Sequence, residues 1–251
     1  MDITPFLPLI TGAIGGATSA GVFKGPIQTL EDLWYINFGY KSSDKVAQLR
    51  EKQAINIEKM RNETITEAAK ISPDDIQEPK LNIIGPALEA SRYYIDEDEL
   101  RNMFAKVIAS SMDKSKENKI HPSFVEIIKQ LSTLDAKILL SFNNSNSHPI
   151  GKLIEQRSNG YFIVVDNFYL HETIENYYLP DISASVSNLI RLGLIEITDQ
   201  QIIESEYFMK NRTVTSFIDT LINTDKSVLN IKSKRLDVTP YGKNFIWTCT
   251  Y

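Results

Sequence analysis

Few residues in this sequence have both the type and the spacing that catalysis or cofactor binding requires. The small-residue run from Gly12 to Gly21 invites a nucleotide-binding interpretation. A phosphate-binding loop, however, continues with Lys and then Ser or Thr after its last glycine, and here Val22 and Phe23 follow. Neither H-E-x-x-H nor G-x-S-x-G occurs in the chain. The sequence therefore predicts a non-enzymatic protein without a cofactor, a metal ion or a small-molecule substrate.

Three other sets of reactive side chains are explained more simply by structural roles than by catalysis or metal binding. The acidic run Asp96–Glu99 is typical of a first helical turn, where carboxylates face the positive end of the helix dipole. A hard cation would instead need converging oxygens. His121 has no nucleophile or carboxylate around it in a known signature, so we expect a capping or packing role. Cys249 is the only cysteine, which excludes an intramolecular disulfide and predicts a small buried side chain.

The N-terminal stretch is the first candidate for an interaction site. Residues 3–23 carry no charge, and a stretch of that length can span a bilayer. Small residues recur there every four positions, as in closely packed helices. Two interpretations stay open: packing against the protein's own core, which the weak hydrophobicity favours, and insertion into the cell membrane. A secretory signal is not expected, because the first charge, Asp2, is acidic. The candidate residues for assembly or membrane contact are Leu9, Ile10, Gly12, Gly16, Ala20 and Trp34.

The second candidate is a set of polar and basic residues in the C-terminal half that could contact nucleic acid. They are Asn188, Arg191, Lys232, Lys234 and Arg235. From residue 143 onward, however, 10 Lys and Arg are outnumbered by 12 Asp and Glu. A module that binds DNA needs cations to neutralise phosphates. We therefore favour protein contacts over DNA binding for this half.

Length and composition are those of an ordinary globular protein. The chain has 251 residues, of which 42% are hydrophobic and 24% charged, and its formal net charge is -5. This charge argues against a surface dedicated to nucleic acid. The single cysteine indicates a cytoplasmic location, with an association with the inner face of the cell membrane if the N-terminus inserts.

Hydrophobic periodicity predicts helices through the first half of the chain. An amphipathic helix is expected over residues 27–38 and a long polar helix over residues 43–71, followed by a linker at 72–82. Three short amphipathic helices should then form a compact helical core. They run from a predicted capping box of Asp96 and Glu99 to Met112, from His121-Pro122 to Leu131, and from a second box of Ser132 and Asp135 to Phe142.

The pattern changes after residue 143, where it indicates a winged helix-turn-helix. Residues 149–156 are predicted as a short helix and residues 161–165 as a strand. A helix from Pro180 should end at Gly193, which permits a left-handed exit into a strand at 194–198. The order is completed by a polar insertion at 199–234, a strand at 236–239 and a helix that begins at Pro240.

Several strings of residues are specific enough to indicate a family. They are Asn82–Ala90 (N-I-I-G-P-A-L-E-A), Glu99–Lys106, Ala109–Lys114 and His121–Leu131 (H-P-S-F-V-E-I-I-K-Q-L), with Ser187–Ile197 and Leu236–Phe245 further on. Together they resemble the abortive infection alpha (Abi-alpha) family over about two thirds of the chain. The resemblance implies a role in bacterial defence, in which an infected cell stops growing or dies before the phage matures. It supplies no catalytic residues.

The predicted fold is mainly α (α+β). It has an apolar small-residue segment at 1–40, a long polar helix and linker at 41–80, a helical core at 81–142 and a winged-helix-like domain with a small β-hairpin wing at 143–251. The leading hypothesis is a non-enzymatic anti-phage protein that contacts itself or a phage component, with possible insertion of its N-terminus into the membrane. The alternative is a winged-helix DNA-binding regulator of a defence or prophage locus.

Overall fold

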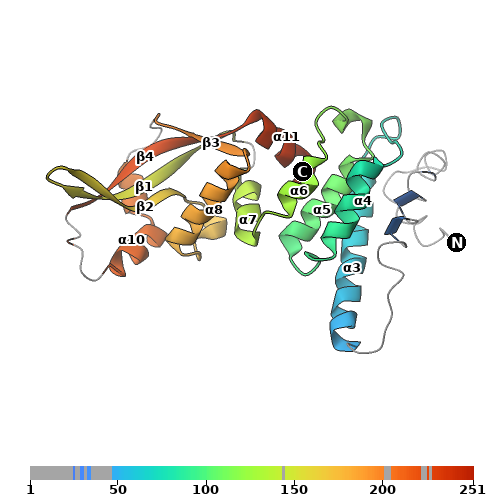
Figure 1. Cartoon of the computed structure of the whole chain (residues 1–251), viewed down its shortest axis with the longest axis horizontal. Helices are drawn as coiled ribbons and strands as arrows, with labels where there is room; N and C mark the ends of the chain where they lie inside the picture. Colours follow the sequence, from blue (N-terminus) through green and yellow to red (C-terminus); the bar gives the residue numbers. More distant parts are fainter. Residues whose placement is uncertain are drawn as a thin grey trace. The chain divides into compact units, whose positions relative to one another are not determined.

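The chain forms two compact units, which are described separately (Figure 1). A computed structural model describes residues 47–142, 145–200, 205–221, 225 and 228–251, together with Gly25, Thr29, Leu30, Leu33 and Trp34. The first unit comprises residues 1–130 and 247–251, and the second comprises residues 131–246. Among the described residues, no helix is both long enough and apolar enough to cross a membrane.

The first unit is helical. Its elements are α3 (Ala47–Ala68), α4 (Leu81–Ser91), α5 (Asp98–Ser110), the 3₁₀ helix η1 (Lys114–Lys116) and α6 (Ser123–Ile128). The long predicted helix is confirmed as α3, which packs on α5. The sequence analysis missed α4, because Gly85 and Pro86 disfavour a helix interior. Burial of the apolar side chains Ile83, Ile84 and Leu88 outweighs that local preference.

The start of α5 differs from the prediction. Glu97, and not Asp96, is the N-cap residue, and its side chain forms no capping hydrogen bond. The carboxylate of Asp96 instead accepts a hydrogen bond from the side-chain amide of Asn56 on α3, at 2.7 Å. The predicted capping box of Asp96 and Glu99 is therefore wrong, because Glu97 occupies the N-cap position and Asp96 lies one residue before it.

A buried arginine on α5 fixes that helix to α3. Arg101 is only 4% exposed, and its guanidinium binds the carboxylates of Glu63 on α3 at 3.0 Å and of Asp98 at 2.7 Å. It also donates to the carbonyl of Ile95 at 3.2 Å. These bonds satisfy a cation that would otherwise be strongly destabilising inside the unit.

The second unit is built on a four-stranded antiparallel sheet in the order β2-β1-β4-β3. The strands are β1 (Ser147–Arg157), β2 (Gly160–Tyr169), β3 (Ile195–Thr198) and β4 (Leu229–Val238). The helices are α7 (Thr133–Ser141), η2 (Glu172–Ile174), α8 (Leu179–Arg191), α9 (Ser205–Met209), α10 (Arg212–Asp219) and α11 (Pro240–Cys249). The fold class is therefore mixed α and β.

The predicted helix at 149–156 is wrong, because these residues lie within β1. Ile150, Leu153 and Ile154 are buried at a spacing that imitates one face of a helix. The pairing of β1 with β2 shifts register on both sides of Leu153, so that neighbouring residues are both buried instead of alternating. A bulge of this kind cannot be recognised from the apolar pattern alone.

The predicted succession from residue 180 onward is confirmed in its order of helix, glycine turn, strand, insertion, strand and helix. Gly193 follows α8 with φ at 71°, a conformation that favours glycine. The capping box of Ser132 and Asp135 at the start of α7 is also confirmed. The predicted insertion at 199–234 contains α9, α10 and the first half of β4. The long hairpin of β1 and β2 adds to the expected small wing, and the assignment as a winged helix is not confirmed.

Candidate functional site

The residues predicted for assembly or membrane contact lie mostly outside the described part of the chain. Leu9, Ile10, Gly12, Gly16 and Ala20 belong to that undescribed stretch. Trp34 is described as helical and half-buried, and Leu30, one helical turn before it, is buried. These two positions agree with the amphipathic helix expected over residues 27–38.

Two of the five predicted nucleic-acid residues are held in a network inside the second unit. The guanidinium of Arg191 donates to the side-chain oxygen of Asn188 at 2.7 Å. The amide nitrogen of Asn188 in turn donates to the buried carboxylate of Asp135 at 2.9 Å. An asparagine that reads a base needs both ends of its amide, and here both are already engaged.

The basic residues of β4 have acidic neighbours. Lys234 binds Asp199 at 2.6 Å, and Arg235 binds Asp237 at 2.8 Å. Lys234, by its hydrogen bond and its charge, lowers the pKa of the Asp199 carboxyl. Burial raises the pKa of Asp237, but hydrogen bonds from Ser147 and Arg235 outweigh it, so this pKa is lowered too. Both partners are therefore carboxylates at neutral pH, and they reduce the positive potential that DNA would need.

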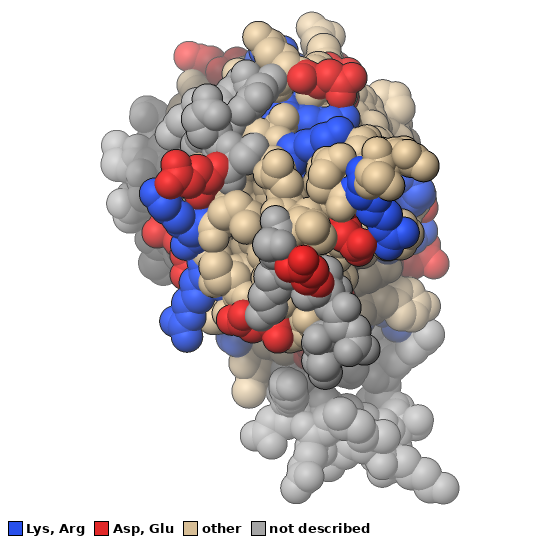
Figure 2. Space-filling view, turned by 90° about the vertical axis from the view of Figure 1, so that its left-hand side faces the viewer, with Lys and Arg blue, Asp and Glu red and all other residues tan. Residues whose placement is uncertain are grey.

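Lys232 differs from its two neighbours. Its ammonium lies 3.6 Å from the centre of the Tyr161 ring on β2, and within the described part of the chain it forms no ion pair. Figure 2 shows Lys and Arg interspersed with Asp and Glu on the face that it presents, without a continuous basic surface among the described residues. Of the three basic residues on β4, Lys234 and Arg235 therefore have acidic partners within the described part of the chain.

A surface at the start of β2 was not predicted from the sequence. Tyr161, Phe162 and Ile163 are consecutive, and they are 46%, 57% and 41% exposed. Arg157 lies over the Phe162 ring at 5.2 Å, as Lys232 does over Tyr161. Side chains alternate along a strand, so Tyr161 and Ile163 point to one face of the sheet and Phe162 to the other, and both faces expose large apolar side chains near this edge.

The same residues form one edge of the sheet. β2 is the outermost strand, and among the described residues β1 is its only neighbour within the sheet. The hydroxyl of Ser183 on α8 donates to the carbonyl of Asp166, so this carbonyl in the later part of β2 is already hydrogen-bonded. For residues 161–165, no backbone hydrogen bond to a segment other than β1 is formed within the described part of the chain. Their outward N–H and C=O groups are available for another strand.

The other reactive side chains occupy structural positions. His121 Nδ1 accepts a hydrogen bond from the backbone N–H of Ser123, the first residue of α6, whose N-cap residue is Pro122. Cys249 is fully buried, and burial raises the pKa of its thiol to about 12, so that it is protonated at neutral pH. Across the residues that the structure describes, no three His, Cys, Asp or Glu side chains lie close enough together to hold a metal ion.

The family model described as abortive infection alpha matches residues 52–249 of the chain. The chain belongs to the abortive infection alpha family. The match begins within α3 and ends with α11, so the family domain contains both the helical elements and the sheet. The resemblance seen in the short strings is thereby confirmed. Comparison of this abortive infection alpha chain with curated proteins and with solved structures finds no match.

Proposed function

We propose that the chain acts in phage defence as a non-enzymatic protein that works through contacts between protein molecules, and that β2 pairs with β2 of a second copy. The observation that carries the proposal is the open edge at residues 161–165 with its three exposed apolar side chains. Membership of the abortive infection alpha family supplies the biological setting.

The composition of the β2 edge favours a second copy as the occupant. Residues 160–165 read G-Y-F-I-V-V and contain no charge and no proline. Proteins usually protect an edge strand with lysine, proline or a bulge. Residues 160–165 contain neither lysine nor proline, although the pairing of β1 with β2 shifts register between Ile163 and Val165. A run of β-branched and aromatic residues also has a strong preference for extended structure and pairs well with its own sequence. Antiparallel pairing across a two-fold axis would place these apolar side chains opposite one another.

The small area of the β2 edge limits the expected affinity of self-association. A pairing limited to half of one strand buries less area than a stable permanent dimer, so we expect reversible association in the micromolar range. Such an interaction responds to the concentration of the protein in the cell. A defence protein that must stay silent before infection could use that property.

A charge placed on the edge should abolish the association. We expect Ile163→Lys to weaken self-association at least about tenfold, because paired strands would have to bury or crowd two lysines. The matched control is Ile55→Lys on α3, where an isoleucine is 54% exposed but belongs to no sheet. Sedimentation velocity over a range of concentrations measures the effect.

Hydrogen exchange identifies the surface through which two copies associate. In the wild-type chain, the amides of residues 161–165 should become more protected as the concentration rises. Equal association of the Ile163→Lys and Ile55→Lys variants, or protection that appears elsewhere, would show that β2 is not the interface. A wild-type chain that stays monomeric alone and associates only with a phage protein would assign the contact to that partner and overturn the homotypic proposal.

The proposal includes a second contact, in which the N-terminal stretch inserts into the membrane. Its support is the uncharged run at residues 3–23 with small residues at Gly12, Gly16 and Ala20. We expect the chain to float with liposomes of bacterial lipid composition, and the Gly12→Leu/Gly16→Leu variant to float less well if helices pack through these positions. A wild-type chain that remains in the soluble fraction before and during infection removes this part of the proposal.

The winged-helix interpretation supplies the alternative, a DNA-binding regulator. Its support is the order of α8, Gly193, β3, β4 and α11. Against it stand the acidic partners of Lys234 and Arg235. Fluorescence anisotropy with duplex DNA at low salt decides between the two functions. Binding that is lost when Arg191, Lys232, Lys234 and Arg235 are all replaced by alanine would favour the regulator.

A further inference from the structure

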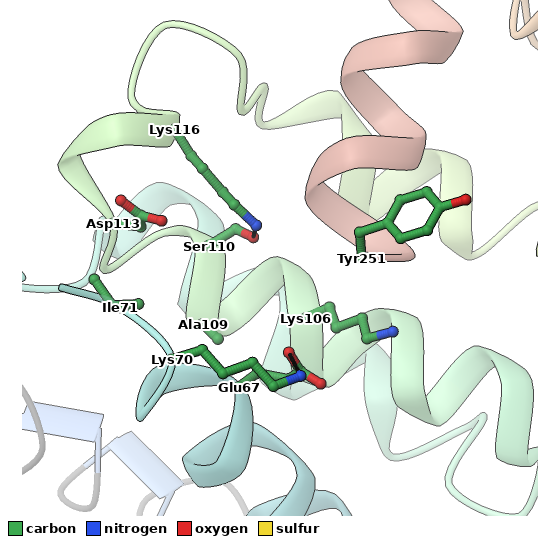
Figure 3. A pocket seen from close by; sticks show the side chains of 9 residues that line it. All are labelled: Glu67, Lys70, Ile71, Lys106, Ala109, Ser110, Asp113, Lys116 and Tyr251. Carbon is green, nitrogen blue, oxygen red and sulfur yellow. Dashed lines mark hydrogen bonds and ion pairs between the residues drawn. The ribbon is translucent and has the colours of Figure 1, made fainter. Parts of the chain in front are cut away.

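A cavity of about 170 Å³ lies within the first unit, and three lysines line it (Figure 3). Lys70 follows α3, Lys106 lies on α5 and Lys116 on η1, so segments far apart in the sequence supply the charges. Tyr251, in the last segment of the first unit, forms the opposite wall.

Two of these lysines have free capacity for a ligand. The ammonium of Lys106 donates to the carbonyl of Thr250 at 2.5 Å. That of Lys116 donates to the hydroxyl of Ser110 at 3.2 Å and to the carbonyl of Trp247 at 3.4 Å. Within the described part of the chain, neither has a carboxylate within ion-pair distance. An ammonium group offers three donors, so both lysines have donors left.

The two acidic residues in the lining are already engaged. Glu67 forms an ion pair with Lys70 at 2.7 Å. The carboxylate of Asp113 accepts the backbone N–H of Ser115 at 2.8 Å and so caps η1. Both still add negative potential to the cavity and moderate its affinity for anions. The positive charges of Lys106 and Lys116 nevertheless remain without a direct counter-charge.

Burial disfavours the charged form of both lysines. Desolvation lowers the pKa of Lys106 and of Lys116 below the ordinary lysine value, although nearby carboxylates act in the opposite direction. A bound anion would supply the missing counter-charge in a partly dry place, where a charge-assisted hydrogen bond is stronger than in water. A third cation, Lys119, lies over the ring of Trp247 at 3.8 Å, next to Lys116.

We propose that this cavity binds the phosphate group of a small soluble phosphate monoester, through the ammonium groups of Lys106 and Lys116. Two ammonium groups match the several acceptor oxygens and the double negative charge of a phosphate monoester, whereas the hydroxyl of Ser110 already donates to the carbonyl of Thr248 at 2.8 Å. The cavity is smaller than typical ligand pockets of roughly 300 to 1,000 Å³. It therefore encloses the phosphate group, and the rest of the ligand lies outside. Because the ligand would contact α5, η1 and the segment after α11 together, it would hold these three segments in one arrangement.

Titration calorimetry in chloride buffer tests the proposal with four probes: inorganic phosphate, adenosine monophosphate, adenosine and vesicles that contain phosphatidic acid. We expect the full-length chain to bind inorganic phosphate with a Kd of about 1 mM and adenosine monophosphate at least as tightly. Adenosine, which has no phosphate, should not bind. Equal binding of adenosine and its monophosphate, or binding to the vesicles alone, would overturn the proposal.

A charge-matched pair of variants locates the site. Lys116→Gln should weaken phosphate binding at least about tenfold, whereas Lys114→Gln, on the exposed side of the same 3₁₀ helix, should leave it unchanged. If Lys116→Gln disturbs the fold, amide chemical shifts of the wild-type chain provide the answer instead. On titration with phosphate they should move at residues 106–116 and near residue 250. Shifts spread over other lysines, or equal Kd values for both variants, would contradict the assignment. This proposal is independent of pairing through β2, because it concerns only the first unit.

Discussion

Replacing Gly242 with alanine should destabilise the second unit by at least about 3 kcal/mol. A Cβ atom at this position of α11 would lie 1.9 Å from the carbonyl oxygen of Leu194, which is a backbone atom and cannot rotate away. The hydroxyl of Thr239 fixes the same place, since it donates to the carbonyl of Gly193 at 2.6 Å and accepts from the N–H of Gly242 at 2.9 Å. The added methyl group must therefore separate α11 from the start of β3.

Gly85→Ala is the matched control. Nothing lies within 4 Å of a Cβ added there, and the residue is inside α4, where alanine is preferred over glycine by up to about 1 kcal/mol. Urea unfolding followed by circular dichroism measures both variants, and hydrogen exchange in β3 and β4 reports the second unit separately. A Gly242→Ala chain within about 1 kcal/mol of the wild type would contradict the close approach of the two backbones.

Loss of Arg101 should destabilise the first unit by about 3 kcal/mol. Arg101→Ala removes the cation that joins Glu63 on α3 to Asp98 on α5, and it leaves the carbonyl of Ile95 without its donor. The effect is smaller than for a fully buried pair, because the carboxylates of Glu63 and Asp98 still reach water. Unfolding in urea, read from the helical signal at neutral pH, measures the change.

The effect of Arg101 should also depend on pH. Its hydrogen bond and charge lower the pKa of the Asp98 carboxyl from 3.8, so their stabilising interaction is complete above that value and is lost as the pH falls through the lowered pKa. The difference between wild type and Arg101→Ala should therefore shrink in strong acid. Lys129→Ala provides a control, because Lys129 pairs with Glu126 on the surface and its loss should give no resolvable change. Equal unfolding midpoints for wild type and Arg101→Ala would contradict the structural role of the arginine.

The sequence predicts the fold correctly where the residues of one short segment determine its local structure. Gly193 after α8, the capping box of Ser132 and Asp135, and Pro240 at the start of α11 each act within a few residues. Predictions from the sequence are wrong where a contact between residues far apart in the chain determines the local structure. Burial overrides Pro86 in α4, and the bulge beside Leu153 gives β1 the apolar spacing of a helix.

The candidate sites were harder to predict for the same reason. The cavity joins Lys106 and Lys116 to residues near position 250, and no pattern in the sequence brings these positions together. Lys234 is paired with Asp199, an acidic residue on another segment, and this pair appears only in the folded sheet. The strand at residues 161–165 was predicted from the sequence, but its place at the edge of the sheet was not.

Protection against phage tests the central claim most directly. Bacteria that express the wild-type chain, Ile163→Lys or Ile55→Lys at equal levels should be challenged with a phage that the wild type restricts, and plaques counted. Defence through pairing of β2 predicts that Ile163→Lys loses protection and that Ile55→Lys keeps it. Full protection by a soluble and folded Ile163→Lys chain would contradict a role of this edge in defence.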